Sequence, residues 1–213
     1  MRIAKNARPL NIERRTPNVE VDRGFFETDP LTCARALIGC VLVWGKAGGR
    51  IVETEAYAEQ DDEASHTFLR RGTRDFIKNN PAGTLYVYLN YGVHWLLNFL
   101  VKGGSANGFV LIRALEPSEG RILMMERRAT SEDRNLCSGP GKLTQALGID
   151  QAFHGRDFFQ IDQARLFCCP QQVVVESDRR VGITKSAELD WRFLMSGSRF
   201  VSIPKRKTRL RAN

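Results

Sequence analysis

The sequence predicts a single mixed α/β (α+β) domain with a curved, largely antiparallel β-sheet flanked by helices. Its 213 residues suffice for one domain, and neither an internal repeat nor a linker divides them. Apolar residues make up 42% and charged residues 26%, which excludes a disordered, fibrous or coiled-coil chain. Short apolar and aromatic segments recur between turns, which is typical of strands in a largely antiparallel sheet.

The first elements follow a polar, basic segment over residues 1–20, which we expect to be a flexible arm. Asp29-Pro30 suits the start of a helix and Gly39 its end, because aspartate caps the first turn and proline fits its first position. The segments Cys40–Trp44 and Arg50–Tyr57 then predict a β-hairpin.

The rest of the chain alternates loops, strands and two helices. Residues 66–82 are expected to form a long irregular loop. Ser118 is a candidate cap for a helix that ends near Arg128, and a short second helix is expected after Gly141 and through Leu147. The expected strands are Leu85–Leu89, Val93–Val101, Phe109–Leu115, Val173–Val175 and Arg199–Ile203.

The positive charge is concentrated at the two ends of the chain. The formal net charge is +8; residues 1–16 carry +4 and residues 204–213 carry +5, so the remainder carries −1. Basic ends of this kind favour contacts with a polyanion, nucleic acid before an anionic membrane, although they also serve solubility alone. We therefore expect a domain over residues 21–203 followed by a basic C-terminal tail over 204–213.

The five cysteines show neither a C-x-x-C pair nor metal-ligand spacing with the histidines. Because residues 1–20 lack a signal peptide, we expect free thiols in a reducing compartment and no metal. We therefore expect the protein to be cytoplasmic. In a bacterium it would be associated with the nucleoid, and in a eukaryote it would be nuclear. The uncharged segment Asn79–Val101 contains Pro81, His94 and four asparagines, so it indicates core strands or a cleft wall rather than a membrane span.

Two glutamates on a predicted strand are the strongest candidates for chemistry. Glu53, Glu55 and Tyr57 share one face by the two-residue period of a strand, although glutamate is depleted in strands. A solvated sheet face is the alternative explanation. A carboxylate beside aromatic rings is a candidate general base, and Arg113, on an apolar strand, needs an acidic partner such as Glu55.

All four tyrosines lie close together in the sequence, and they favour an aromatic slot over simple core packing. A slot of this kind suits a flat ring with hydrogen-bonding edges, which describes a nucleobase. Core packing remains an equal alternative for Tyr86. The residues concerned are Tyr57, Tyr86, Tyr88 and Tyr91, with His66 and Asn98 nearby.

The segment Ser138-Gly139-Pro140-Gly141-Lys142 departs from a Walker phosphate-binding loop at both ends. It could still present backbone N–H groups and Lys142 to a phosphodiester at a helix start. A plain helix N-terminus explains the segment equally well.

Several motifs, taken in order, resemble those of one known family. They are RIVETEAY at 50–57, DEASH at 62–66, GTLYVYLNYGVHWLLN at 83–98, VLIRALEP at 110–117 and LCSGPGKLTQALGI at 136–149. Over roughly residues 22–203 the chain resembles the alkyladenine (3-methyladenine) DNA glycosylases of the monofunctional, single-domain type. The resemblance implies a monomer that flips alkylated or deaminated purines out of double-stranded DNA. It hydrolyses their N-glycosidic bond, leaves an abasic site and uses no cofactor or membrane.

The resemblance also implies roles for individual residues. Glu55 matches the catalytic carboxylate and Arg113 its partner. The residues assigned to the base pocket are Tyr57, His66, Tyr88, Asn98 and Leu111. The residues assigned to DNA contacts are Tyr91, which would fill the gap left in the duplex, His94, Arg128 and Lys142.

The chain departs from the family between its matching motifs. A Thr-Pro-Arg-Asn stretch followed by Met-Phe is replaced by GTRDFIKNN at 72–80, and His94 stands where an aromatic residue is common. A helix-hairpin-helix glycosylase is one alternative, suggested by SGPGK, but that class needs a catalytic aspartate further downstream than Asp150, and the first helix of the hairpin is not evident. A non-catalytic nucleic-acid-binding domain with the same pocket is the other, and release of a base from DNA would exclude it.

Overall fold

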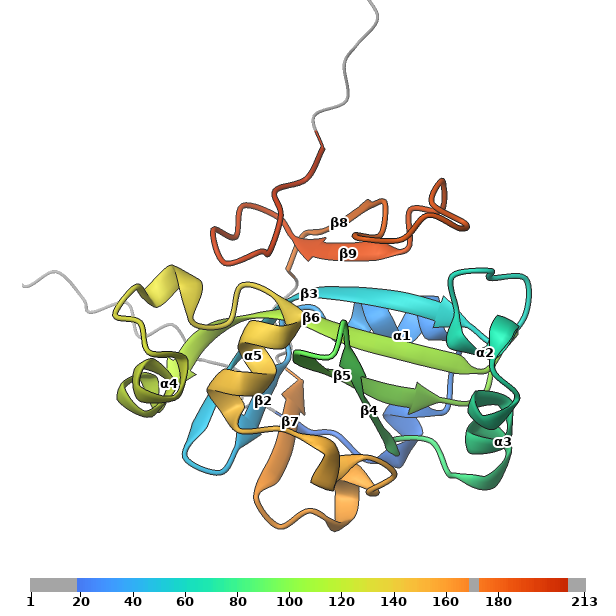
Figure 1. The fold of residues 1–213 in the computed structure, drawn as a ribbon, viewed down its shortest axis with the longest axis horizontal. Coiled ribbons are helices and arrows are strands. Elements are labelled where there is room, and N and C mark those ends of the chain that lie inside the picture. The colour runs from blue at the N-terminus through green and yellow to red at the C-terminus, as the bar shows by residue number, and fades with distance from the viewer. Residues whose placement is uncertain (1–18, 169–172, 207–213) are drawn as a thin grey trace, which may run out of the picture.

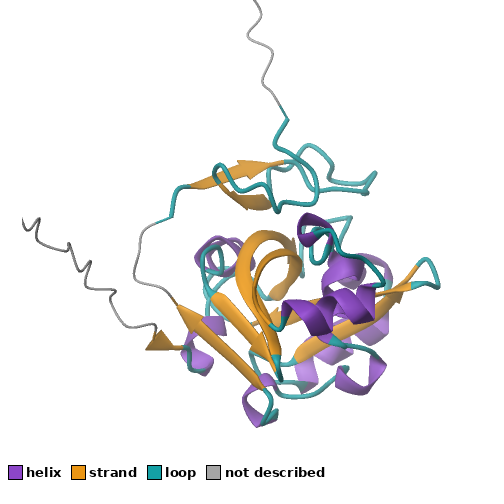
Figure 2. Cartoon of the chain, turned by 90° about the vertical axis from the view of Figure 1, so that its left-hand side faces the viewer, coloured by secondary structure: helices purple, strands orange, loops and turns teal. Residues whose placement is uncertain are grey.

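The computed structural model describes residues 19–168 and 173–206. Within them, nine strands form one sheet whose main path runs β1-β7-β2-β3-β6-β5-β4 (Figure 1). Every pairing between these strands is antiparallel. A view from the side shows that the sheet is strongly curved, with helices packed around it (Figure 2). The predicted fold class is therefore confirmed.

The elements are bounded as follows. The strands are β1 (Val19–Glu20), β2 (Val41–Trp44), β3 (Ala47–Ala58), β4 (Leu85–Asn90), β5 (His94–Val101), β6 (Gly108–Glu119), β7 (Ala164–Cys168), β8 (Val175–Asp178) and β9 (Arg192–Met195). The α-helices are α1 (Pro30–Ala36), α2 (His66–Leu69), α3 (Arg71–Asn79), α4 (Arg121–Arg128) and α5 (Pro140–Leu147). Short 3-10 turns cover Arg23–Phe26, Asp133–Asn135, Gln151–Phe153 and Phe158–Gln160.

The long strands β3 and β6 form the centre of the sheet. On the side of β3 that faces away from β6, the first part of β3 pairs with β2, and Glu53–Glu55 pairs with β9. The pairing between β3 and β6 is irregular between Ile51 and Thr54, where β3 passes from one partner to the other. Gly108 lies so close to the β3 backbone that a Cβ there would be 2.1 Å from the Tyr57 carbonyl oxygen. A glycine is therefore required where β6 begins.

Helix α1 closes one face of the sheet and begins as predicted. The Asp29 side chain accepts hydrogen bonds from the backbone N–H groups of Leu31 and Thr32, both at 3.0 Å, and Pro30 occupies the first turn. The helix packs on β3 and β6. Its buried side chains Cys33 and Ala34 belong to a core that also contains the β2, β5 and β7 side chains.

Two predictions about helices are wrong. Residues 66–82 are not an irregular loop, because they contain α2 and α3. The charges of this segment lie on its solvent side, while Thr73 and Ile77, four residues apart, are buried. Ser118 does not cap a helix, because β6 continues through Glu119 and α4 starts only after Gly120, which has a left-handed backbone (φ +64°).

The predicted C-terminal strands are also wrong in position. Val173–Val175 overlaps β8 only at its last residue, and Arg199–Ile203 forms turns, whereas β9 lies earlier. Strand β7 was not predicted from the sequence. This strand pairs with β2 on one side and β1 on the other, and these contacts with distant segments cannot be read from its own sequence. The predicted arm lies outside the described residues except for its last two residues, which form β1, and residues 207–213 of the tail also lie outside.

No helix in residues 19–168 or 173–206 is long and apolar enough to cross a bilayer. Cys33 and Cys137 are buried free thiols, as predicted.

Candidate active site

A row of side chains crosses five strands on one face of the sheet. The strand register places Arg192, Glu55, Leu111, Asn98 and Tyr86 in line, on β9, β3, β6, β5 and β4 respectively. Residues directly opposite each other in antiparallel strands point to the same face. The sheet therefore gathers residues that are far apart in the sequence into one site.

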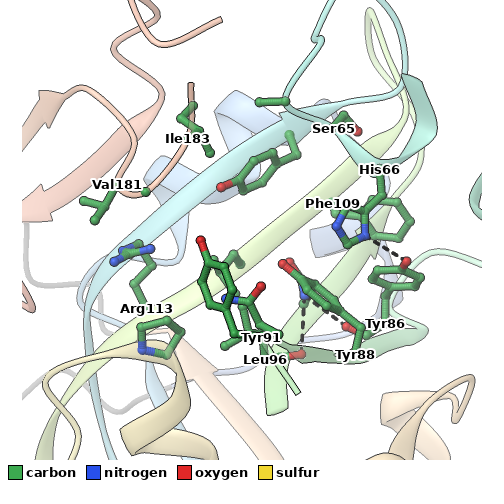
Figure 3. Close-up of a pocket in the computed structure, with 17 residues that line it drawn as sticks. Ser65, His66, Tyr86, Tyr88, Tyr91, Leu96, Phe109, Arg113, Val181 and Ile183 are labelled. Atoms are coloured by element: carbon green, nitrogen blue, oxygen red, sulfur yellow. Dashed lines mark hydrogen bonds between the residues drawn. The ribbon is translucent and has the colours of Figure 1, made fainter. Parts of the chain in front are cut away.

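A cavity of about 360 Å³ lies over this row (Figure 3). Seven predicted site residues line it: Tyr57, His66, Tyr88, Tyr91, Asn98, Leu111 and Arg113. Its size and its mixture of aromatic and polar groups are typical of small-molecule sites. The remaining wall comes mainly from residues that were not assigned to the site: Ala64, Ser65, Tyr86, Asn90, Leu96, Phe109, Pro140, Val181, Gly182 and Ile183.

Glu55 lies beneath the wall of this cavity and is fully buried. Its Oε2 accepts hydrogen bonds from the Tyr57 hydroxyl at 2.8 Å and from Arg113 Nη1 at 3.3 Å. Its Oε1 accepts one from the backbone N–H of Val181 at 2.7 Å. All three donor residues line the cavity, so the carboxylate is one layer away from a bound molecule.

The groups around Glu55 change the pKa of its carboxyl group. Burial raises the pKa of Glu55 above its ordinary value, while Arg113 and the hydrogen bonds from Val181 and Tyr57 oppose the shift. Burial alone would lower the pKa of Arg113, but Glu55 and Glu53 raise it above its ordinary value. The predicted pairing of Arg113 with an acidic partner is thus present, and Arg113 stays charged.

Glu53, the other candidate base, is fully buried away from the cavity. Its carboxylate accepts hydrogen bonds from Arg113 Nε at 2.9 Å and Arg192 Nη1 at 3.1 Å. The backbone N–H and hydroxyl of Ser202 also donate to it, at 2.5 and 2.8 Å. Four hydrogen bonds hold the Glu53 carboxylate, and Arg113 is bonded to both Glu53 and Glu55.

His66 and Tyr88, in the aromatic wall, carry no charge at neutral pH. Burial and the nearby Arg70 lower the pKa of His66 to about 4, and burial raises the pKa of Tyr88 to about 12. The ring centroids of these two residues are 4.5 Å apart, and His66 Nδ1 lies 3.0 Å from the Tyr86 hydroxyl (Figure 3). The Asn98 amide donates to the Tyr86 carbonyl at 3.0 Å, which fixes its orientation in the wall.

Tyr91 stands at the tip of the hairpin between β4 and β5. Its side chain is 84% exposed, which excludes core packing. Tyr91 and Gly92 both have positive φ angles, +50° and +71°, as tight hairpin turns require. A bulky residue in this conformation is strained, and such strain is concentrated at functional sites.

Three predicted DNA contacts lie outside the cavity lining. His94 packs against α5, where a Cβ on Gly141 would come within 2.7 Å of its side chain. The Arg128 guanidinium donates to the Gln145 side chain and so joins α4 to α5. Lys142 Nζ lies 3.4 Å from Asn135 Oδ1. Their DNA-contacting roles stay predictions.

The wall segment 181–183 was not identified from the sequence. It belongs to the loop between β8 and β9, and Figure 3 shows Val181 and Ile183 across the cavity from His66. Within this segment, the glycine at position 182 is the one feature of the sequence that suggests an unusual backbone conformation, and the structure gives it a positive φ of +74°. Asp62, the first residue of the DEASH motif, is fully buried together with Arg180 from this loop.

Comparison with known proteins shows the family to which the chain belongs. The family model described as methylpurine-DNA glycosylase (MPG) matches residues 24–199. A Rhizobium johnstonii protein named "Putative 3-methyladenine DNA glycosylase" is 50% identical over 183 residues, which cover 85% of this chain and 89% of that protein. Proteins of the same name from Rhizobium etli and Agrobacterium fabrum are 49% and 45% identical, over 85% and 86% of this chain and 88% and 92% of their own. The resemblance found in the motifs is confirmed: the chain belongs to the methylpurine-DNA glycosylase family and is an enzyme of the DNA glycosylase class.

Proposed function

We propose that the protein flips alkylated or deaminated purines out of duplex DNA into this cavity and hydrolyses their N-glycosidic bond, leaving an abasic site. The substrate class comprises 3-methyladenine, 7-methylguanine, hypoxanthine and ethenoadenine. One observation carries the proposal: a buried carboxylate, Glu55, whose three donors all line an aromatic cavity beside an exposed tyrosine. The names of the relatives mention 3-methyladenine, one member of this class.

Glu55 is suited to act as the general base. An ionised carboxylate offers about four lone-pair positions. Among the described residues, two donors occupy Oε2 and one occupies Oε1. We propose that a water molecule binds the remaining position on Oε1. Glu55 would take a proton from that water, and its charge would stabilise the cationic sugar of the transition state.

Two features select the substrate: the cavity walls suit flat bases, and damaged bases are held less strongly in the duplex. Tyr57, Tyr88 and the uncharged His66 offer ring faces for stacking and edges for hydrogen bonds. Extruding a base costs a few kcal/mol, and damaged or mispaired bases cost least. A base that is cationic through alkylation leaves readily, whereas hypoxanthine needs protonation as it leaves.

Base release tests this function directly. The purified protein is incubated with duplexes that each contain one lesion, and abasic sites are detected by alkaline strand cleavage. We expect alkali-labile sites at the position of each damaged purine and few in undamaged DNA. Intact DNA after tight binding would instead support the non-catalytic nucleic-acid-binding alternative.

Asn98 is expected to exclude guanine. Its amide is held by the Tyr86 carbonyl beside Leu111, where it would crowd the exocyclic amine of a guanine base. Asn98→Ser shortens this side chain and should raise the release of undamaged guanine relative to hypoxanthine. Chromatography of the released bases measures that ratio.

Asn90→Ser, at the cavity rim, is the matched control for the Asn98 variant, because it also replaces a lining amide. An unchanged ratio of guanine to hypoxanthine release in Asn98→Ser would remove Asn98 from the selectivity wall.

A further inference from the structure

The loop between β8 and β9 contacts Glu55, and all of its residues except Arg180 are at least partly exposed. Val181, Gly182 and Ile183 form cavity wall, and Figure 1 shows the β8–β9 hairpin as a layer attached along β3. The side chain of Arg180, in contrast, is completely buried in this loop. A buried cation in an exposed loop requires a specific partner.

That partner is Asp62, in the turn that follows β3. Arg180 Nη1 donates to Asp62 Oδ2 at 2.6 Å and Nη2 donates to Oδ1 at 2.7 Å, and both side chains are fully buried. Two parallel bonds of this kind fix direction as well as distance. Asp62 also accepts hydrogen bonds from the backbone N–H groups of Ala58 and Ala64, at 3.2 and 3.1 Å. The pair therefore ties the loop to both ends of the turn.

Arg180 also contacts Tyr57, one of the aromatic residues that line the cavity. Its guanidinium lies 4.6 Å from the ring centre of Tyr57 and 5.1 Å from that of Trp191. Its Nη1 donates to the Ala56 carbonyl at 3.0 Å, directly before Tyr57 in β3. The Tyr57 ring is thus supported by a cation close to it.

The next residue along the chain, Val181, donates its N–H to Glu55. The loop has other tethers near this point. The Lys185–Glu63 ion pair spans 3.3 Å, but its side chains are 69% and 49% exposed, and such surface pairs contribute little. Ser186 Oγ accepts the Glu63 N–H at 3.1 Å, also in an exposed position. The buried ion pair between Arg180 and Asp62 is therefore the main interaction that holds the loop next to the Val181 N–H.

We infer that Arg180 and Asp62 are positioning residues: their ion pair holds the Val181 N–H against Glu55 and the Tyr57 ring against the base site. This inference rests on the proposed function of Glu55. Neither residue lines the cavity, so both act through the groups that they hold.

The consequence for chemistry is a change in the acidity of Glu55. A hydrogen bond donated to a carboxylate favours its ionised form, so losing the Val181 N–H raises the pKa of Glu55 further. The other charged or titratable groups facing Glu55 are Arg113 on β6, Glu53 and Tyr57 on β3, and Tyr88 on β4. Arg192, opposite on β9, is engaged by Glu53 and Asp178.

The test compares two variants with two controls. Asp62→Asn removes the ion pair and leaves Arg180 charged; the double variant Asp62→Asn/Arg180→Gln avoids an unpaired buried cation if the single variant does not fold. Lys185→Ala breaks the exposed tether of the same loop. Leu166→Ala lowers stability through the core on β7, away from the cavity. Single-turnover rates against pH and hydrogen exchange of the Val181 amide are measured for each.

We expect the acidic limb of the rate profile to move up by about one pH unit in the Asp62 variants, with recovery at higher pH. Exchange of the Val181 amide should accelerate about tenfold or more, and both controls should behave like the wild type. A Val181 amide that stays protected, or a rate loss equal at every pH, would overturn the inference. If the wild type releases no base, the proposed function fails, while amide exchange still decides whether the pair holds the loop.

Discussion

Glu55→Gln is expected to slow base release by roughly 10²–10⁴-fold, the usual contribution of a general base. Glutamine has the same shape, and its oxygen can still accept the Val181 N–H. It cannot take a proton from water at neutral pH. Because the cavity walls are unchanged, binding to lesion-containing duplex DNA should stay close to that of the wild type.

Single-turnover excision and fluorescence anisotropy measure the two properties of this variant. Glu59→Gln is the matched control, since Glu59 lies just beyond β3 and bonds to Asn107 outside the cavity lining. Retained turnover in Glu55→Gln would show that another group acts as the base. Lost binding together with lost turnover would indicate a collapsed cavity.

The pH profile provides a second view of Glu55. The ionised form is the base, so the rate falls as the pH drops through the pKa of Glu55. Burial raises that pKa, and the acidic limb should therefore lie above the ordinary range of a glutamate. His66 stays neutral down to about pH 4, so its titration does not produce this limb.

Tyr91→Ala is expected to melt close to the wild type and yet lose most of its excision activity. The side chain is 84% exposed, so truncation leaves no cavity in the core. An aromatic wedge at a rigid hairpin tip would offset the stacking lost when a base leaves the duplex. The loss should be greatest for lesions in well-stacked pairs and smaller for mispaired ones, which are extruded at less cost.

Tyr91→Gly sharpens this test, because the backbone there has a positive φ. Glycine relieves that strain, which costs about 1–2 kcal/mol for a residue with a side chain. This variant should therefore melt at or above the wild-type temperature and show the same loss of excision. A lower melting temperature in both variants, or equal losses on every lesion, would contradict the wedge.

The parts of the site that follow local rules were predictable from the sequence. The two-residue period of a strand places Glu55 and Tyr57 on one face, and an arginine on an apolar strand requires an acid, which Arg113 finds in Glu55. The Asp29 cap and the central strands follow from equally local preferences. These rules act within a few residues, so one sequence is enough to apply them.

The missing parts depend on contacts between distant segments. The bond from Val181 to Glu55 spans 126 positions in the sequence, and the pair of Arg180 with Asp62 spans 118. Nothing in an Arg-Arg-Val-Gly segment distinguishes a buried arginine from a solvated one. Strand β7 is similarly placed by its neighbours rather than by its own pattern.

The central claim is that a damaged base enters the cavity over Glu55 and is hydrolysed there. Ethenoadenine is itself fluorescent, so a duplex with one such base reports its surroundings during rapid mixing. With Glu55→Gln, we predict a fast fluorescence change as the base stacks on Tyr57 and Tyr88, and no free base afterwards. The wild type should show the same fast change followed by release. Binding without the change, or release by Glu55→Gln at the wild-type rate, would contradict the claim.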